Sequence, residues 1–499
     1  MSPLLLASLI LGYFLLLLLI SYFTTRTNNN ESFFTGDRKS PWYVVAYGMI
    51  GASLSGVTFM SVPGSIATKS FSYMQVVLGY LIGYVVIAFV LLPIYYKLNV
   101  TSIYTYLQKR FGYWSYKSGA IAFLFSRIIG AAFRLYLVAI VLQNLIIEPL
   151  NIGIPFAGTV MITILLIWIY TFKGGIKTIV WTDTLQTTFM LLSVCLTIFF
   201  IAKQMDMSVI QLFKKVSDSS YSKVFFFEDF KVSTLHFGKQ FMAGIFISIV
   251  MTGLDQDMMQ KNLTCKNLKD AQKNVIGLGI TLIPVNFLFL ALGAILYLYA
   301  AQTNFIIPEK ADLLFATIAL DSGLPIIIGI MFIIGLIAAA YSSADSALTA
   351  LTTSVCYDIL EAKADSANIQ SIRTRVHVLM SAILVFVIII FHQLNDDSVI
   401  YELFNVAGYT YGPLLGMFSY GIFTKWKVND LMVPLVCIIS PLVCYQLQQH
   451  SDVLLGGYQL GFELLIINGG LTFTLLWLSS LVKSTPNNNN SLDSDFPQN

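Results

Sequence analysis

Long apolar segments separated by short polar loops occupy most of the chain. A helix of roughly 20 residues crosses the hydrocarbon core of a bilayer, and it satisfies its backbone hydrogen bonds internally. The pattern therefore predicts an all-α membrane protein with 13 transmembrane helices. The expected spans are 3–23, 41–68, 73–96, 117–147, 154–171, 175–202, 239–260, 272–300, 323–358, 375–393, 398–424, 429–447 and 458–482.

The composition agrees with this pattern. Of the 499 residues, 57% are hydrophobic and 11% are charged, whereas about a quarter of the residues of a soluble domain are charged. Soluble protein classes are therefore excluded, and no nucleic-acid partner is expected because the basic residues lie in short loops. A membrane enzyme is not expected either, since "GASLS" at 51–55 lacks the final glycine of a nucleophile elbow.

Lysine and arginine are unevenly distributed between alternate loops. One set of loops holds most of them, including Lys109 and Lys261, whereas the short loops of the other set hold only Lys69 and Lys310. The loop 203–238 holds more, but long loops have little weight in this comparison. Because positive charge marks cytoplasmic loops, we expect the N-terminus outside and the C-terminus in the cytoplasm.

Two of the predicted helices are interrupted near their middle. Gly, Ser or Pro residues break the apolar segments 48–64 and 244–258, which begin two groups of five helices, 41–202 and 239–424. Interrupted helices at corresponding positions of two halves indicate an inverted-repeat transporter with its binding site at the breaks. The alternative is that the glycines only allow neighbouring helices to pack closely.

Residues 1–482 are expected to form one transmembrane domain. It would consist of the two repeats and three further helices, 3–23, 429–447 and 458–482. The remaining residues, 483–499, are rich in asparagine and are expected to form a disordered cytoplasmic tail.

The stretch "AAAYSSADSALTALTT" at 338–353 is unusually polar for a membrane-spanning helix. At helical spacing one face carries Ala339, Ser342, Ser343 and Ser346, with Asp345 at its edge. Oxygen atoms on one helix face suit a monovalent cation once an unwound helix supplies carbonyl groups. The alternative is a packing stripe of small residues whose hydroxyls bond back to their own helix.

Four motifs resemble those of the sodium/solute symporters. They are "GGIKTIVWTDTLQ" (174–186), "GLDQDMMQKNL" (253–263), the polar stretch itself, and "GPLLGMFSYGIF" (412–423). The sequence is most similar to the sialic-acid and anion-transporting branches, which include iodide, monocarboxylate and vitamin symporters. The resemblance implies a leucine-transporter-like fold with broken first helices in an inverted five-helix repeat. It also implies a monomeric protein of the bacterial inner membrane that imports a small organic solute with Na⁺ by alternating access.

The resemblance also implies sodium ligands. The first sodium site would take carbonyl groups of Gly51, Leu54 and Ala339 and the hydroxyls of Ser342 and Ser343. A second site, found in some members, would be formed here by Asp183, Ser342, Asp345 and Ser346. The sialic-acid branch has serine where this chain has Asp345, so the two differ in charge at that position.

For the substrate, the resemblance in "LSGVTFM" implies that Ser55 and Thr58 face the solute, with Tyr73 or Gln75 on the next helix. The sialic-acid branch places an arginine near Gly130, and this chain has Arg127 and Arg134 on either side.

At least one of these arginines is expected to bind an anionic solute, a sugar acid such as sialic acid or a monocarboxylate. The alternatives are that the arginines snorkel or pair with acidic residues, and that the solute is a neutral sugar or polyol. A channel-like or signalling protein would need a continuous polar pore or an output domain, and the sequence shows neither.

Overall fold

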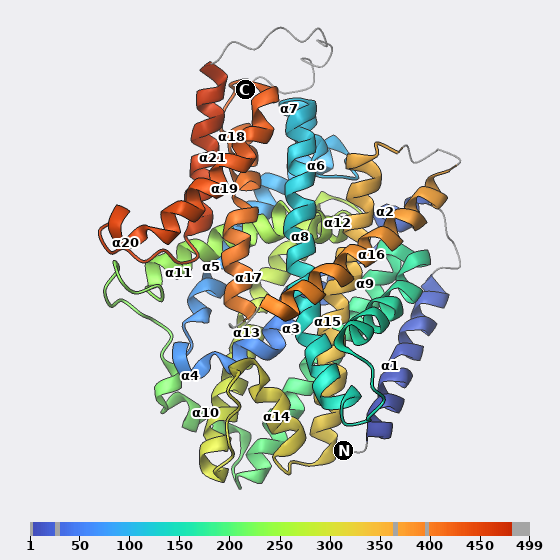
Figure 1. The fold of residues 1–499 in the computed structure, drawn as a ribbon, viewed down its shortest axis with the longest axis vertical. Helices are drawn as coiled ribbons and strands as arrows, with labels where there is room; N and C mark the ends of the chain where they lie inside the picture. Colours follow the sequence, from blue (N-terminus) through green and yellow to red (C-terminus); the bar gives the residue numbers. More distant parts are fainter. Residues whose placement is uncertain (1–2, 25–29, 363–367, 395–398, 482–499) are drawn as a thin grey trace.

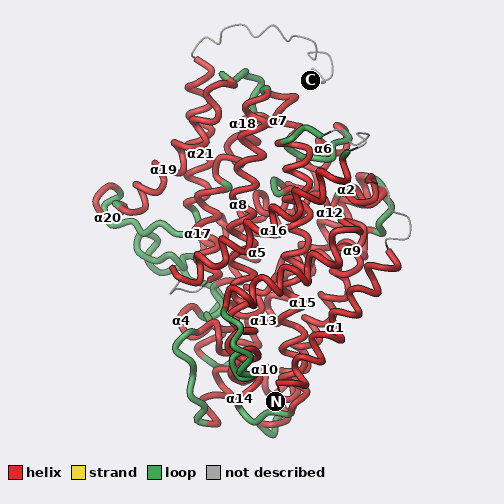
Figure 2. The backbone as a smooth tube through the Cα atoms, turned by 45° about the vertical axis from the view of Figure 1, so that its right-hand side comes forward, coloured by secondary structure: helices red, strands yellow, loops and turns green. Residues whose placement is uncertain are grey.

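The computed structural model describes residues 3–24, 30–362, 368–394 and 399–481, and nearly all of its regular structure is helical (Figures 1 and 2). One isolated bridge joins Ser40 to Cys265. The expectation of an all-α membrane protein is confirmed. The predicted tail, 483–499, lies outside the described residues.

The apolar helices follow one another along the chain with few intervening residues. They are α1 (Pro3–Thr24), α3 (Trp42–Gly64), α5 (Tyr73–Val86), α6 (Leu92–Leu98), α8 (Tyr113–Leu142), α9 (Phe156–Gln204), α11 (Phe237–Ser248), α12 (Gln256–Asn262), α13 (Leu268–Thr303), α15 (Ile326–Ser354), α16 (Ile369–Leu394), α17 (Val399–Thr410), α18 (Gly412–Phe423), α19 (Val433–Gln449) and α21 (Leu464–Leu481). Shorter helices connect them: α2 (Asn30–Thr35), α4 (Ile66–Lys69), α7 (Thr105–Arg110), α10 (Val209–Ser217), α14 (Leu314–Asp321) and α20 (Ser451–Leu454).

Among the described residues, nine helices are long and apolar enough to cross a membrane, and a bent pair makes ten. Three further apolar helices are shorter, at Ser8–Thr24, Phe156–Thr171 and Gly412–Phe423. The total of thirteen spans therefore stays a prediction.

Both interruptions expected from the sequence are present. In α3 the backbone leaves helical geometry at Ser55, where φ is 57° and ψ is 174°. The second break bends Phe237–Gly253 by 70° relative to Gln256–Asn262. A third break, at Gly175, divides α9 at a φ of 53° that suits glycine, and it separates the two spans predicted there.

The polar helix α15 lies at the centre of the bundle. Every residue from Gly335 to Ser354 is buried, and α15 packs against α3, α8 and α9. The outer helices α16 and α19 instead expose large apolar side chains, such as Phe386 and Leu442. This distribution is expected in a bilayer, since polar groups inside the hydrocarbon are tolerated only where protein surrounds them.

Helices α5 and α11 touch through their backbones at two glycines. A Cβ atom on Gly244 would overlap the carbonyl group of Val76, and one on Gly79 would overlap that of Phe241. The contact brings the helix after the first break against the helix that leads into the second.

Gly244→Ala should therefore destabilise the protein by about 1–3 kcal/mol, because the backbones must separate to admit a methyl group. The measurement is the melting temperature of the detergent-solubilised protein. Gly12→Ala is the control, since nothing lies within 4 Å of the added Cβ. Equal melting temperatures for both variants would show that the close contact is not required.

Candidate functional site

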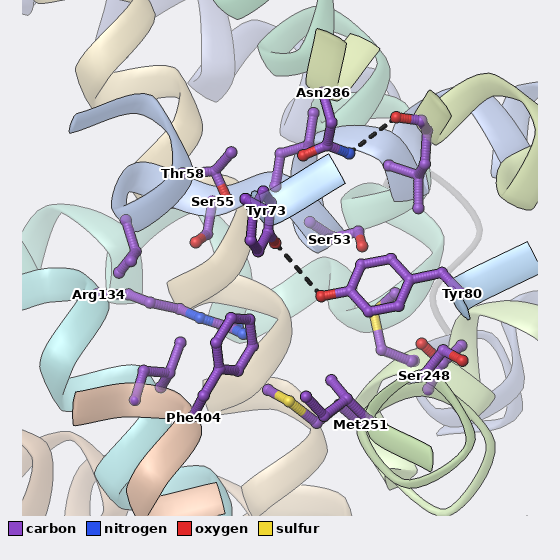
Figure 3. Close-up of a pocket in the computed structure, with 18 of the residues that line it drawn as sticks. Ser53, Ser55, Thr58, Tyr73, Tyr80, Arg134, Ser248, Met251, Asn286 and Phe404 are labelled. Carbon is purple, nitrogen blue, oxygen red and sulfur yellow. Dashed lines mark hydrogen bonds between the residues drawn. The ribbon is translucent and has the colours of Figure 1, made fainter. Parts of the chain in front are cut away.

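A cavity opens beside the break in α3 (Figure 3). Its volume is about 60 Å³. Its walls come from α3, α5, α8, α11, α13 and α17, and from Met251, Thr252 and Met258 at the second break. The residues that line it include Ala52, Leu54, Ser55, Thr58, Tyr73, Tyr80, Arg127, Arg134, Ser248, Asn286 and Phe404.

Five of the six residues predicted to face the substrate line this cavity: Ser55, Thr58, Tyr73, Arg127 and Arg134. Gln75 does not. Its amide nitrogen donates to the Leu235 carbonyl at 3.0 Å, and its amide oxygen accepts from the Phe226 backbone at 3.2 Å. Gln75 is therefore placed to hold the loop before α11, which no pattern in the sequence indicates.

The two arginines of α8 differ in their surroundings. Arg127 forms an ion pair with Asp257, and its Nη1 lies 3.8 Å from Asp255 Oδ2. Arg134 is 5% exposed, and its buried Nε and Nη1 have no hydrogen-bond partner among the described residues. No carboxylate in the described part of the chain lies within ion-pair distance of it. The guanidinium group of Arg134 therefore lies at the cavity without an ion-pair partner in the described structure.

Aromatic and amide groups complete the wall. Figure 3 shows the Arg134 side chain reaching toward Phe404, whose ring stacks on Tyr73 with centroids 6.2 Å apart. The Tyr73 and Tyr80 hydroxyls lie 3.3 Å apart. Asn286 donates to its own helix at Leu282, and its Oδ1 is buried without a partner in the described structure. Asn286, Tyr80 and Phe404 were missed from the sequence, because each lies in an apolar segment without a motif.

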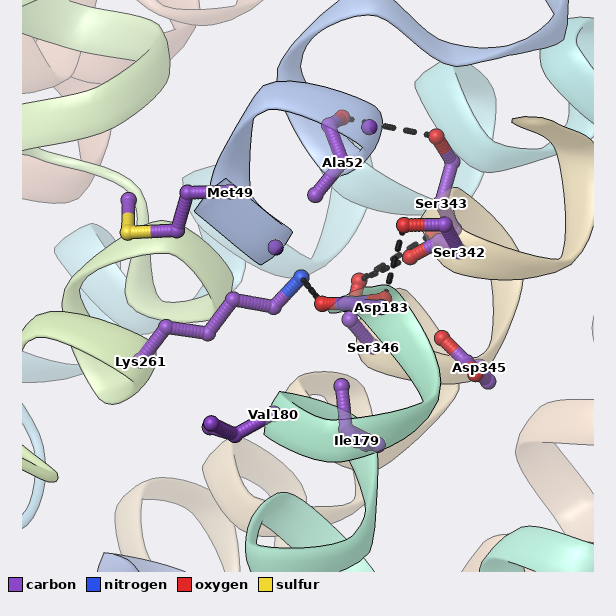
Figure 4. A network of polar contacts seen from close by, with 12 residues as sticks. Met49, Ala52, Ile179, Val180, Asp183, Lys261, Ser342, Ser343, Asp345 and Ser346 are labelled. Atoms are coloured by element: carbon purple, nitrogen blue, oxygen red, sulfur yellow. Dashed lines mark hydrogen bonds and ion pairs between the residues drawn. The ribbon is translucent and has the colours of Figure 1, made fainter. Parts of the chain in front are cut away.

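The residues predicted for the first sodium site meet where α3 passes α15 (Figure 4). The Ser343 hydroxyl lies 3.4 Å from the Ala52 carbonyl oxygen and 3.5 Å from that of Ala339. Both distances are at the outer limit of a hydrogen bond, so this oxygen is only weakly engaged. A Cβ on Gly51 would be 3.5 Å from Ser342 Oγ, and Leu54 lines the cavity next to them. The first sodium site stays a prediction.

The residues predicted for the second site are arranged differently. Asp183 accepts from the Ser342 hydroxyl at 2.7 Å and from the Lys261 ammonium group at 2.7 Å. Asp345 contacts neither and accepts instead from the Tyr170 hydroxyl at 2.8 Å. The Ser346 hydroxyl lies 2.9 Å from the Ser342 carbonyl.

The sequence interpretation placed Lys261 in a loop, and that was wrong, because the residue lies in α12. Its side chain is 1% exposed. Lysine is common in loops, so the residue type alone did not indicate that this side chain is buried. Its place in "GLDQDMMQKNL", one of the four motifs, could have done so.

The same motif holds α12 in place. Asp255 caps the helix, because one of its oxygens accepts from the backbones of Asp257 and Met258 at 3.0 and 3.3 Å. Its other oxygen accepts from the Tyr411 hydroxyl at 2.6 Å. Gln256 donates to the Thr101 carbonyl at 2.8 Å. The half-helix beyond the second break is therefore tied to α8, to Tyr411 between α17 and α18, and to the segment before α7.

Comparison with known proteins agrees with this geometry. The profile of the sodium:solute symporter family matches residues 33–430. The chain belongs to this family. Its members are transporters, so the expectation that the protein is not an enzyme is confirmed, and sodium is the coupling ion.

Two relatives in the family are sodium/sialic acid symporters. One, from Aliivibrio fischeri, is 26% identical over 456 residues, which are 89% of this chain and 87% of the relative. The other, from Proteus mirabilis, is 24% identical over 441 residues, 85% of each chain. The human sodium/iodide cotransporter is 22% identical over 79% of this chain and 61% of its own length.

Two solved structures share the fold. A Na⁺-coupled sialic acid symporter in its substrate-bound outward-open state superposes with a TM-score of 0.80 at 21% identity, over 96% of this chain and 98% of the other. A nucleobase-cation-symport-1 family transporter superposes with a TM-score of 0.56 at 14% identity, over 91% and 94%.

Ser343→Ala should weaken the apparent affinity for Na⁺ by about tenfold or more, since a contact to a charged group contributes about 1.5–3 kcal/mol. The measurement is the Na⁺ concentration that half-stabilises the purified protein against heat. Ser381→Ala is the control, because that hydroxyl bonds back to the His377 carbonyl on its own helix. If Ser343→Ala, Ser342→Ala and Ser346→Ala all leave the Na⁺ dependence unchanged, these serines serve only in packing.

Proposed function

We propose that this symporter imports a small organic anion, a sugar acid such as sialic acid or a monocarboxylate, together with Na⁺ by alternating access. The observation that supports the anionic substrate is Arg134, a buried guanidinium without a carboxylate partner in the described structure. A buried charge is costly unless it is paired. A carboxylate in the cavity would supply the partner, with two parallel hydrogen bonds of the kind that arginine favours.

The rest of the wall suits a polar solute with an apolar face. Ser55, Thr58 and Asn286 offer hydroxyl and amide groups, while Tyr73 and Phe404 offer aromatic rings. The cavity volume of about 60 Å³ is too small for a sugar acid. Entry of the solute therefore requires the walls to move apart, as alternating access does.

The break in α3 gives a physical route for coupling. One side of the break meets Ser343 at the Ala52 carbonyl, and the other side presents Ser55 and Thr58 to the cavity. A sodium ion bound between α3 and α15 would hold the broken backbone in one geometry, and so would position the hydroxyls that face the solute. Each ligand would then favour the same conformation, which is the thermodynamic basis of coupled binding.

The remaining topological expectations belong to the same proposal. The N-terminus would lie outside and the C-terminus in the cytoplasm, and 41–202 and 239–424 would form the inverted repeats of a monomer. In support, α1 begins at the lower end of the molecule in Figure 1 and α21 ends at the upper end. The basic residues of α6 and α7 lie at that upper end, as cytoplasmic charges would.

Uptake into proteoliposomes should follow the Na⁺ gradient and not a proton gradient. The probes are radiolabelled N-acetylneuraminate, lactate and glucose, each supplied with an inward Na⁺ gradient and again without Na⁺. We expect one of the two anions to accumulate only with Na⁺. Uptake that persists without Na⁺ and follows an imposed pH gradient would contradict the proposal.

Arg134→Gln should reduce the affinity for that anion by more than tenfold, because the charge-assisted pair contributes about 1.5–3 kcal/mol. The anion affinity is read from ligand-dependent thermal stabilisation in Na⁺. Arg127→Gln provides the contrast: it leaves Asp255 and Asp257 without their arginine, so it should lower the melting temperature even without ligand. Unchanged anion affinity in Arg134→Gln would remove the arginine from the substrate site.

A further inference from the structure

We infer that the ammonium group of Lys261 holds the place of a second sodium ion at Asp183, so that the protein binds one Na⁺ rather than two. The inference rests on the proposed sodium sites but not on the identity of the solute. It makes Lys261 the residue that sets the ion stoichiometry of this chain.

The ion pair occupies the oxygen atoms that a second sodium ion would need. Lys261 Nζ lies 2.7 Å from Asp183 Oδ2, and Oδ1 of the same carboxylate accepts from Ser342 Oγ at 2.7 Å. The Lys261 and Asp183 side chains are each 1% exposed, so water does not screen the pair. Figure 4 shows the ammonium group beside the carboxylate that Ser342 also meets.

The other residues of the second site make contacts of their own, and among them Asp345 Oδ1 alone is buried without a hydrogen-bond partner in the described structure. The Ser346 hydroxyl donates either to Asp257 Oδ2, at 3.2 Å, or to the Ser342 carbonyl, at 2.9 Å. Asp345 accepts instead from the Tyr170 hydroxyl at 2.8 Å, and no hydrogen bond or ion pair of the described structure joins it to Lys261 or Asp183. A sodium ion at Asp183 would therefore lie against the ammonium group, which repels it at short range.

The surrounding backbone keeps the lysine in this place and leaves little room. The Lys261 carbonyl accepts from the Thr264 hydroxyl at 2.7 Å and from its backbone at 3.1 Å. The next residue, Asn262, accepts from Asn274 of α13 at 2.6 Å. On the opposite side, a Cβ on Gly48 would lie 2.9 Å from that of Asp183. The close approach of α3 and α9 therefore leaves little space on that side of Asp183.

A tethered ammonium group changes the number of sodium ions, and so the net charge, that each transport cycle moves. It compensates Asp183 permanently, whereas a sodium ion would be bound and released in each cycle. One Na⁺ with a monoanion moves no net charge, so the membrane potential would not drive this step. The loss of one coupling ion is therefore the functional consequence of the lysine.

The test counts the sodium ions bound to the purified full-length protein at saturation, with radiolabelled Na⁺ alone and no solute. We expect one ion per wild-type chain and two in Lys261→Gln, which removes the ammonium group but keeps Asp183. Lys261→Arg, which retains a positive charge, is the matched control and should bind one. A wild-type count of two, or a count of one in a folded Lys261→Gln, overturns the inference.

A double variant keeps the test decisive if Lys261→Gln fails to fold. Asp183→Asn/Lys261→Gln removes both charges of the pair together, and it should bind one ion, as the wild type does. A fall from two ions to one between wild type and double variant would show instead that Asp183 holds Na⁺ in the natural protein. Failure of the anion proposal leaves these counts unchanged, because no solute is present.

Discussion

Backbone carbonyl groups inside the hydrocarbon region need partners within the protein, and the break of α3 at Ser55 frees several of them from their own helix. The residues around the break depend on this constraint. The Ser343 hydroxyl of α15 lies against the Ala52 carbonyl, and the Thr187 hydroxyl of α9 accepts from the Gly51 N–H group. The break itself costs energy, since a serine at this φ and ψ adopts a conformation that essentially only glycine tolerates. A broken helix can therefore persist here only because α9 and α15 surround it with hydroxyl groups.

Buried charged side chains also need partners within the protein. Lys261 pairs with Asp183, and Arg127 pairs with Asp257 beside Asp255. These pairs join α9 to α12 and α8 to α12, so the half-helix beyond the second break is held by ion pairs on two sides. Arg134 is the cation of the described core that has no such partner. Its position on the cavity, beside the break in α3, places recognition of an anion next to the proposed sodium ligands.

The comparison structures separate what the fold shares from what this chain adds. A TM-score of 0.80 at 21% identity means that helix packing is retained while most side chains differ. Family membership therefore accounts for the helical bundle and the sodium dependence. In our proposals the substrate and the ion stoichiometry depend on single side chains, Arg134 and Lys261, which the shared fold does not specify.

Hydropathy along the chain was enough to predict the helices and both interruptions, because a membrane-spanning segment has few alternatives to a helix and because Gly, Ser and Pro mark where it breaks. Helical spacing also predicted the polar face of α15, since side chains four residues apart share a face whatever surrounds the helix. What spacing could not decide is which partner each side chain reaches. Arg127 and Arg134 lie on one helix face, yet only tertiary packing brings aspartates of the α12 segment to one and leaves the other in a cavity. For the same reason, the sequence did not predict that Gln75 binds the loop before α11 or that Asp345 accepts from Tyr170. Lys261 reached Asp183 across 78 residues of sequence, and contacts of that kind exist only once the helices have packed.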